Sequence, residues 1–229
     1  MYVRPINNPT LMNRTVSDKA PSMYTRDWVV DKLITPVAIG LVLAAFGLLA
    51  PGWIARHFQP PTCTNPRGLV QVTPAGVSGT AKPSDHFPIK GLVTYQASNL
   101  VDGNTSTAWV EDKPGLGLGS DVELRFDRPV DLRLVCVVNG YSQSWDLYKR
   151  NSRARLLGVS TDQGHVSAML TDAGSPDRPA VYQQISCPTG ATARLKMSLE
   201  SAYAAQQDTS RIKAYPDTSI SEVEVWVRP

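Results

Sequence analysis

Apolar and uncharged residues follow one another without interruption between Leu33 and Ala55. A helix over this segment is about 35 Å long at about 1.5 Å per residue, more than the roughly 30 Å hydrocarbon layer of a bilayer. The segment has no polar face, unlike the amphipathic helices at the surface of globular domains. We therefore predict one transmembrane helix within residues 28–56.

Basic residues are concentrated before this segment rather than after it. The N-terminal side carries Arg4, Arg14, Lys19, Arg26 and Lys32. Because Lys and Arg favour the cytoplasmic side, we expect a cytoplasmic N-terminus and an extracytoplasmic C-terminal domain. The basic and apolar stretches are both too long for a cleaved signal peptide. The helix is therefore expected to be an uncleaved signal anchor of a single-pass cell-membrane protein.

The regions that flank the predicted helix differ in composition. Residues 1–27 lack apolar periodicity and are expected to form a disordered head. Residues 57–68 are rich in proline and predict a stiff linker. Within the helix, Gly40 and Ala44 form a pair of small residues four positions apart, through which two copies of the helix can pack closely. A homo-oligomer through this face is one predicted assembly.

Beyond residue 69 the pattern changes to short segments in which apolar and polar residues alternate. This period is typical of half-buried strands, and turn residues such as Asp102-Gly103, Asp127-Arg128-Pro129 and Asn139-Gly140 separate the segments. The predicted strands are 69–73, 121–126, 132–138, 154–160, 165–171, 181–186, 193–199 and 221–227. Strands do not alternate with helices, which argues against a nucleotide-binding α/β fold. Residues 69–229 are therefore predicted to form an all-β sandwich or jelly roll.

Several motifs of this domain occur together in a characteristic order. They are ASNLVDGNTSTAWVE at 97–111, NGY at 139–141, N-x-R at 151–153 and DTSISE at 217–222. In these motifs the domain resembles the discoidin, or coagulation-factor C-type, family of galactose-binding-like jelly rolls. It is most similar to the bacterial NADase-type glycan-binding domains. The resemblance spans residues 95–229 and implies carbohydrate binding through loops at one end of the sandwich.

One predicted loop combines aromatic and basic side chains. Aromatic faces stack on sugar rings, and Asn and Arg bind hydroxyl or carboxylate groups. The candidate ligand-binding residues are Tyr141, Trp145, Tyr148, Arg150, Asn151 and Arg153. The other interpretation is that the loop folds back across the end of the barrel, with Trp145 and Tyr148 as packing. Residues 203–216 form a weaker second candidate loop.

Three residues of the motifs have mainly structural interpretations. Asp102 is expected to accept hydrogen bonds within its own turn, and Trp109 to fill the sheet edge as an apolar plug. Glu222 is expected to form an ion pair with Arg153 or Arg155. The resemblance also implies a calcium ion, for which Asp102 and Glu222 are the natural oxygen donors, although no dense acidic loop is present. No other metal or cofactor is predicted.

The three cysteines leave the disulfide pattern open. An extracytoplasmic domain permits disulfides. Cys63 and Cys187 lie in loop-like segments and are the predicted intrachain pair, while Cys63 bridging two copies is the alternative. Cys136 falls on the apolar face of a predicted strand and is expected to be a small buried hydrophobic residue.

Motifs that would indicate an enzyme or a nucleic-acid-binding protein are missing from the sequence. The histidines are scattered, and there is no HExxH, P-loop or glycine-rich dinucleotide turn. A net charge of +3 without basic runs among aromatics indicates no nucleic-acid partner. Two functions remain: a membrane-tethered domain that binds cell-envelope glycan, or a non-catalytic accessory subunit whose sandwich docks on partner membrane proteins.

Overall fold

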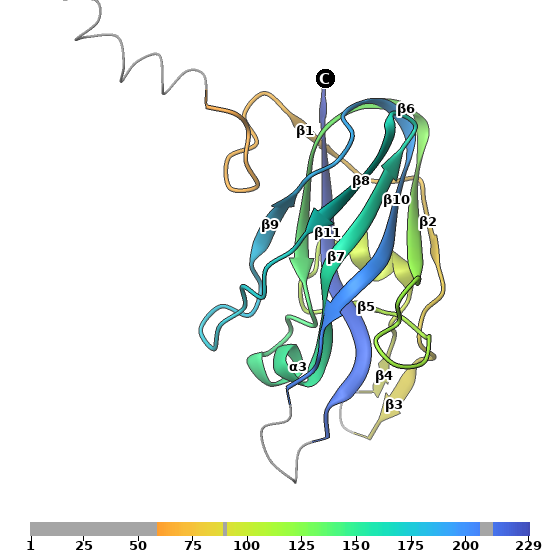
Figure 1. Cartoon of the computed structure of the whole chain (residues 1–229), viewed down its shortest axis with the longest axis vertical. Helices are drawn as coiled ribbons and strands as arrows, with labels where there is room; N and C mark the ends of the chain where they lie inside the picture. Colours follow the sequence, from red (N-terminus) through yellow and green to blue (C-terminus); the bar gives the residue numbers. More distant parts are fainter. Residues whose placement is uncertain (1–58, 89–90, 207–212) are drawn as a thin grey trace, which may run out of the picture. The chain divides into compact units, whose positions relative to one another are not determined.

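The alternating segments of the sequence form a two-layered β domain (Figure 1). The structure is a computed structural model, and it describes residues 59–88, 91–206 and 213–229. The chain divides into two units, Met1–Gln59 and Pro60–Pro229, and the β domain is the second. The predicted head and transmembrane helix lie outside the described residues, among which no helix is long and apolar enough to cross a bilayer.

Strands make up most of the described domain. They are β1 Val70–Val72, β2 Gly76–Gly79, β3 Asp85–Phe87, β4 Gly91–Val93, β5 Trp109–Val110, β6 Asp121–Asn139, β7 Asn151–Thr161, β8 Gly164–Met169, β9 Tyr182–Ile185, β10 Gly190–Tyr203 and β11 Tyr215–Arg228. The 3-10 helix η2 covers Ala97–Val101, and the helix α3 covers Trp145–Arg150. All the predicted strands overlap observed ones, which confirms the all-β jelly-roll class.

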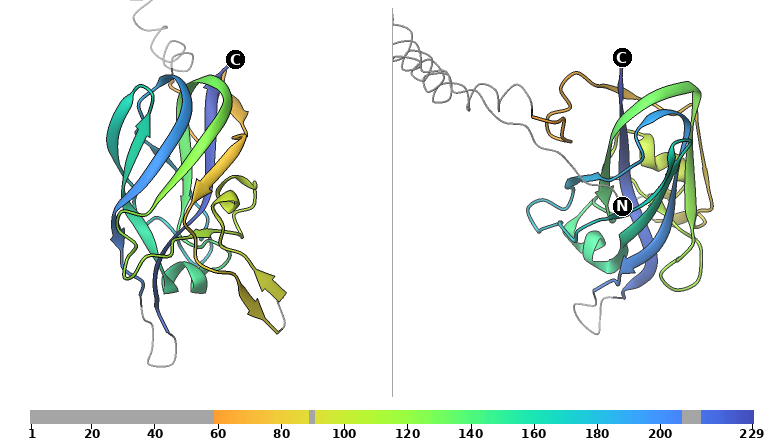
Figure 2. Two further views of the ribbon diagram at one scale, coloured as in Figure 1. Left: turned by 90° about the vertical axis from the view of Figure 1, so that its right-hand side faces the viewer. Right: turned by 45° about the horizontal axis from the view of Figure 1, so that its top comes forward.

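Strand β6 connects the two layers of the sandwich. Its first part pairs with β2 and β10, and its last part pairs with β11 and β9. A parallel pairing of β11 with β7 joins the layers at the other side. The helix α3 and the β3–β4 hairpin lie at the end of the domain opposite the C-terminus (Figure 2).

The predicted turn at Asp127-Arg128-Pro129 is wrong. The structure has one continuous strand across it, with these three residues exposed. Pro129 has no partner in the register of any neighbouring strand, as expected for a residue without an amide hydrogen. The strand bends between layers at this point instead of reversing, so the local turn residues were a misleading signal.

The core fills the space between the layers. Trp109 is only 1% exposed and packs within the main apolar cluster, which confirms its predicted role as a plug. Its Nε1 donates a hydrogen bond to the carbonyl oxygen of Thr80 at 2.8 Å. This bond satisfies the one polar atom of the ring, and it ties the segment before β3 to the core.

The disulfide joins Cys63 to Cys136, so the predicted Cys63–Cys187 pair is wrong. A turn closed by hydrogen bonds between Thr62 and Asn65 holds Cys63 over β6, with 5.7 Å between the two Cα atoms. Cys187 is a free, half-buried thiol, and burial raises its pKa to about 11. The prediction that Cys136 is buried is confirmed, but the apolar face on which it rested gave no information on the disulfide partner of this residue.

Candidate ligand-binding cleft

The predicted loop after Tyr141 contains the short helix α3. Ser144 caps it, because its Oγ accepts a hydrogen bond from the amide of Leu147 at 3.2 Å. Asp146 stands in the first turn and Lys149 and Arg150 in the last, which suits the helix dipole. The predicted ligand-binding residues divide into three that line a cleft beside this helix and three that do not.

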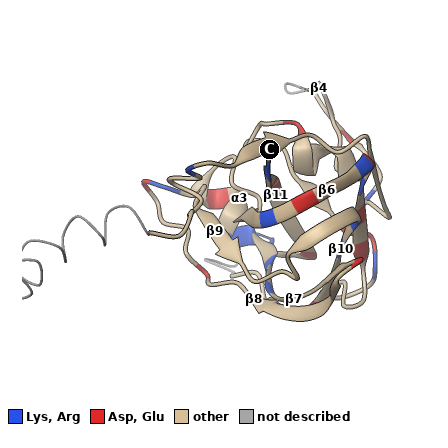
Figure 3. Ribbon diagram, turned by 90° about the horizontal axis from the view of Figure 1, so that it is seen from above, with Lys and Arg blue, Asp and Glu red and all other residues tan. Residues whose placement is uncertain are grey.

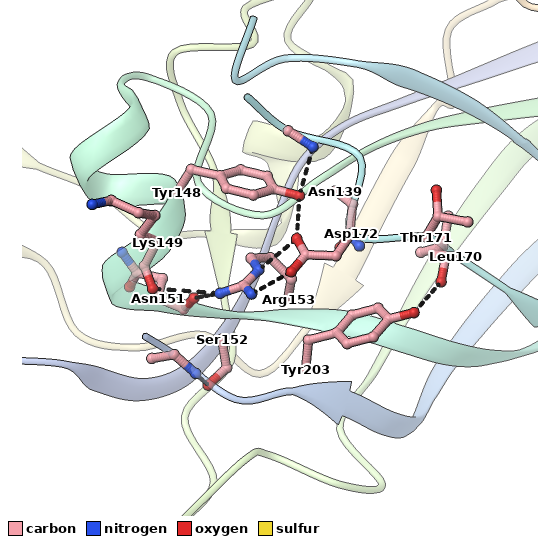
Figure 4. Close-up of polar contacts among 12 residues, drawn as sticks. Asn139, Tyr148, Lys149, Asn151, Ser152, Arg153, Leu170, Thr171, Asp172 and Tyr203 are labelled. Carbon is pink, nitrogen blue, oxygen red and sulfur yellow. Dashed lines mark hydrogen bonds and ion pairs between the residues drawn. The ribbon is translucent and has the colours of Figure 1, made fainter. Parts of the chain in front are cut away.

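Tyr148 and Arg153 are buried and do not line this cleft (Figure 4). The guanidinium of Arg153 binds Asp172 through two hydrogen bonds, of 3.1 and 2.7 Å, and lies 5.3 Å from the ring centroid of Tyr148. The Tyr148 hydroxyl donates to the same carboxylate at 2.7 Å, and burial followed by this bond raises its pKa to about 12. These two residues are buried, support the end of the sandwich and do not line the cleft beside α3.

Gly140 is required by this packing. Its φ of +78° is one that side chains rarely adopt. A Cβ atom at this position would lie 2.7 Å from Arg153 Cγ and 2.8 Å from Tyr148 Cε2. The NGY motif therefore lets the chain pass directly against the Tyr148–Arg153 pair.

Trp145 lies on the outer side of the same cluster. The Trp145 ring stacks on the Tyr148 ring, with 5.5 Å between the two centroids. Lys149 Nζ lies 5.7 Å from the centroid of the Trp145 ring. Trp145 is half-buried and does not line the cleft on the other side of α3. The packing interpretation of Trp145 and Tyr148 therefore agrees with the geometry.

This cleft, of about 330 Å³, opens beside α3, between the helix and the β3–β4 hairpin. Three predicted site residues line it: Tyr141, Arg150 and Asn151. The same loop and helix also contribute Gln143, Ser144, Asp146 and Leu147. Segments far away in the sequence contribute the other walls, among them Lys82, Asp85, Phe87, Tyr95 and Tyr215. Its size lies within the usual range for sites that hold small ligands.

Aromatic rings make up much of the cleft wall. Tyr95 and Tyr141 pack edge to face, with 6.4 Å between centroids and an 87° angle between planes. The Tyr95 hydroxyl donates to Asp85 Oδ2 at 3.0 Å, and burial together with this carboxylate raises the pKa of Tyr95. Phe87 is 42% exposed at the rim.

The two cations of the cleft wall both have carboxylate partners. Lys82 Nζ lies 2.9 Å from Asp217 Oδ2, and 5.9 and 5.6 Å from the ring centroids of Tyr95 and Tyr215. Arg150 Nη1 lies 3.1 Å from Asp146 Oδ2. Burial alone would lower the pKa of Lys82, but the hydrogen bond and charge of Asp217 raise it above its ordinary value.

Sequence reasoning did not single out Lys82, Asp85, Phe87 or Tyr95, whereas Tyr215 lies in the second candidate loop, residues 203–216. Tyr95 is two residues before the motif that begins at Ala97, which is the one local signal that marked any of the first four. Lys82, Asp85 and Phe87 reach the cleft because β3 and the segment before it lie beside α3 in the folded chain. A search confined to one loop has no means of finding them.

A second cavity, of about 300 Å³, lies between β1, the turn after η2 and β11. Asp102 and Glu222 both line it. As predicted, Asp102 organises its own turn: its two oxygens accept from the amide of Asn104 at 2.9 Å and the hydroxyl of Thr107 at 2.7 Å. The predicted ion pair of Glu222 with an arginine is wrong, because Arg153 binds Asp172 and Arg155 lies over the Tyr203 ring.

Glu222 is a buried carboxylate with an unsatisfied oxygen. The residue is 2% exposed, and its Oε2 has no hydrogen-bond partner. Burial, and next the charge of Asp102, raise the pKa of Glu222 to about 8. Asp102 and Glu222, whose Oε2 is the unpartnered oxygen, are the two carboxylates of this cavity, and they are the side chains that would hold a hard cation such as calcium, with carbonyl oxygens and water as its remaining ligands. Among the described residues, no group of three or more His, Cys, Asp or Glu side chains is placed to hold a metal ion.

A serine and a histidine meet away from both cavities. Ser160 Oγ and His165 Nδ1 are 2.9 Å apart, and His165 Nε2 lies 3.8 Å from Glu200 Oε1. Ser160 lies on β7 and His165 lies opposite it on the adjacent strand β8, where the His165 side chain is 56% exposed. This cross-strand pair lacks the desolvated pocket in which such groups act as catalysts.

Charges of both signs are interspersed along β6 (Figure 3). Arg125 pairs with Glu123 at 2.6 Å and Arg133 with Asp131 at 2.7 Å, while Lys196 of β10 lies 2.7 Å from Asp121. These strands therefore present no continuous basic surface.

The jelly roll with a cleft at one end defines a discoidin-like, galactose-binding-like domain of the F5/8 type C kind. The model of the NAD glycohydrolase translocation F5/8 type C domain family matches residues 75–226, so the chain belongs to that family. The resemblance seen in the sequence motifs is thereby confirmed. No curated protein matches the chain.

Several solved structures are similar to the domain. Arabinofuranosyltransferase AftD from Mycobacteria is 16% identical with a TM-score of 0.46, and the match covers 69% of this chain but 11% of that one. An F5/8 type C domain from Bacteroides fragilis is 14% identical with a TM-score of 0.44, covering 71% and 99%. The CBM32 of AlyQ, solved with 4,5-unsaturated mannuronic acid, is 13% identical with a TM-score of 0.44, covering 68% and 97%.

Proposed function

We propose that this chain is a non-catalytic, membrane-anchored protein whose F5/8 type C domain binds a glycan of the cell envelope in the cleft beside α3. The observation that carries the proposal is the cleft wall, in which Tyr95, Tyr141 and Tyr215 stand among hydrogen-bonding side chains. Aromatic faces pack on the apolar faces of sugars, while carboxylates and amides bind hydroxyl groups. Family membership supports the same function.

Binding of the full chain to envelope polysaccharide, after purification in mild detergent, tests the cleft. Tyr215→Ala removes a wall of the cleft and should reduce retention at least tenfold. Tyr203→Ala is the matched control, because Tyr203 is half-buried outside the cleft, with its hydroxyl bonded to the Leu170 carbonyl. Equal retention of both variants would exclude this cleft as the glycan site.

The anchor is proposed to be the apolar segment from Leu33 to Ala55, with the N-terminus in the cytoplasm. The excess of basic residues before this segment supports the orientation. Protease added to intact cells should remove the part of the chain after Pro61 and leave residues 1–32 protected. A protected C-terminal domain would reverse the proposed topology.

The alternative is an accessory subunit that docks on partner membrane proteins. The observation that favours it is the β3–β4 hairpin, where Leu92 is 66% and Phe87 42% exposed. Leu92 does not line the cleft, whereas Phe87 does. Under the glycan proposal Phe87→Ala weakens glycan retention and Leu92→Ala does not. Under the alternative, Leu92→Ala releases co-purifying membrane proteins.

A further inference from the structure

We infer that the cleft beside α3 takes an uncharged sugar and discriminates against uronates and other anionic glycans, and that Asp217 and Asp146 set this preference. The inference rests on the proposed glycan-binding function and specifies its ligand class. It follows from how the charges of the cleft wall are already paired.

Lys82 is enclosed by groups that compensate its charge. Its ammonium lies 2.9 Å from Asp217 Oδ2 and within 6 Å of two tyrosine ring centroids, at 5.9 and 5.6 Å. Asp85 contributes a second negative charge that, after Asp217, favours the protonated lysine. An anionic ligand that approached Lys82 would also approach these two carboxylates, and their repulsion would offset the attraction of the ammonium.

Arg150 is held on all three nitrogens. Nη1 binds Asp146 at 3.1 Å, Nη2 binds the Tyr215 hydroxyl at 3.1 Å, and Nε binds the carbonyl oxygen of Lys213 at 3.0 Å. Arginine recognises a carboxylate through two parallel N–H bonds, which requires a free edge of the guanidinium. Each edge of Arg150 is already used by at least one of these bonds.

The carboxylates, in contrast, retain acceptor capacity. Asp85 uses Oδ2 for Tyr95 and Asp146 uses Oδ2 for Arg150. In the part of the chain that the structure describes, no hydrogen bond reaches Oδ1 of either side chain. An ionised carboxylate oxygen only accepts, so these two positions suit donating hydroxyl groups and repel an anion. The wall is therefore complementary to a hydroxyl-rich, uncharged ring.

Binding of the full chain in detergent to two sets of probes tests the inference. The neutral set is arabinogalactan, galactan and mannan, and the anionic set is alginate and polygalacturonate. The wild-type chain should retain at least one neutral polymer and bind both anionic polymers at least tenfold more weakly.

Asp217→Asn removes the negative charge that pairs with Lys82 and should increase affinity for the anionic polymers at least tenfold, in a manner that salt suppresses. Asp131→Asn is the matched control, because it changes the charge by the same amount at the Arg133 pair outside the cleft. The double change Asp217→Asn with Lys82→Gln should abolish the gain. If Asp217→Asn does not fold, Asp146→Asn replaces it, since that side chain is 54% exposed and the change removes the negative charge that pairs with Arg150 Nη1.

The outcomes separate the two levels of the proposal. Equal or stronger binding of the anionic polymers by the wild-type chain overturns the uncharged-sugar inference and leaves glycan binding intact. Failure to retain any polymer of either set overturns glycan binding and the inference with it. A gain of anionic binding in Asp131→Asn equal to that in Asp217→Asn overturns the role of Asp217.

Discussion

The two cavities of the domain have similar volumes, about 330 and 300 Å³, but different walls. The cleft beside α3 is lined by aromatic rings, and each of its cations is paired. The cavity at Asp102 and Glu222 has no aromatic lining, and it holds a buried carboxylate oxygen without a partner. Satisfied charges beside aromatic faces suit a neutral ligand, whereas an unsatisfied carboxylate requires a proton or a cation. Under the proposals made above, the pairing of the charges, more than their presence, distinguishes the ligands expected in the two cavities.

The largest expected effect is on the free energy of unfolding, and it comes from a change in the core between the two layers. Trp109→Ala should lower the free energy of unfolding by about 3–5 kcal/mol, since a fully buried ring is lost together with its bond to Thr80. Equilibrium unfolding in urea measures the change. Trp145→Ala is the matched control and should cost about 1 kcal/mol, because it loses one stacked pair outside the core. A cost below about 1 kcal/mol for Trp109→Ala would contradict its role as a plug.

Calcium should act on the second cavity alone. At about a hundredfold excess over its Kd, a ligand that binds only the folded state stabilises it by about 2.7 kcal/mol. Thermal unfolding with and without calcium should show this gain for the wild-type chain and for Tyr215→Ala. Glu222→Gln should lose it. An unchanged melting temperature of the wild-type chain in calcium would contradict calcium binding in this cavity.

In the absence of calcium, Glu222 predicts a pH dependence. Its folded pKa is about 8, above the ordinary value of 4.5, so the folded state binds the proton more tightly. Its contribution to stability is therefore fully present below about pH 4.5 and is lost as pH rises through 8. The slope is at most about 1.4 kcal/mol per pH unit. Urea unfolding across this range should show a shallower fall for Glu222→Gln, and parallel curves would argue against this role.

The smallest expected effect is that of a change at Tyr148, which distinguishes a structural role of this residue from a role in ligand binding. Tyr148→Phe removes the hydroxyl that bonds Asp172 and Gly174, and it should cost about 1 kcal/mol of unfolding free energy. Glycan retention should remain close to that of the wild-type chain, because Tyr148 does not line the cleft. A tenfold loss of retention with unchanged stability would instead place Tyr148 in the binding site.

Local sequence patterns determined the strands, the Asp102 turn and the buried Trp109. Each of these depends on the alternation of neighbouring residues or on hydrogen bonds within one turn, so short segments carry the information. The same is true of the motifs that place the chain in its family. Local turn residues misled at Pro129, because a strand that changes layers needs a bend and not a reversal.

Tertiary structure alone decided the partners. Cys63 reaches Cys136 across 73 positions, Lys82 reaches Asp217 across 135, and Arg153 selects Asp172 instead of Glu222. Such pairings depend on which strands lie side by side, and a long-range contact leaves no periodic trace in the chain. For this reason the sequence identified aromatic and basic residues suited to a site, while the fold assigned Tyr148 and Arg153 to support and brought Lys82, Tyr95 and Tyr215 into the cleft.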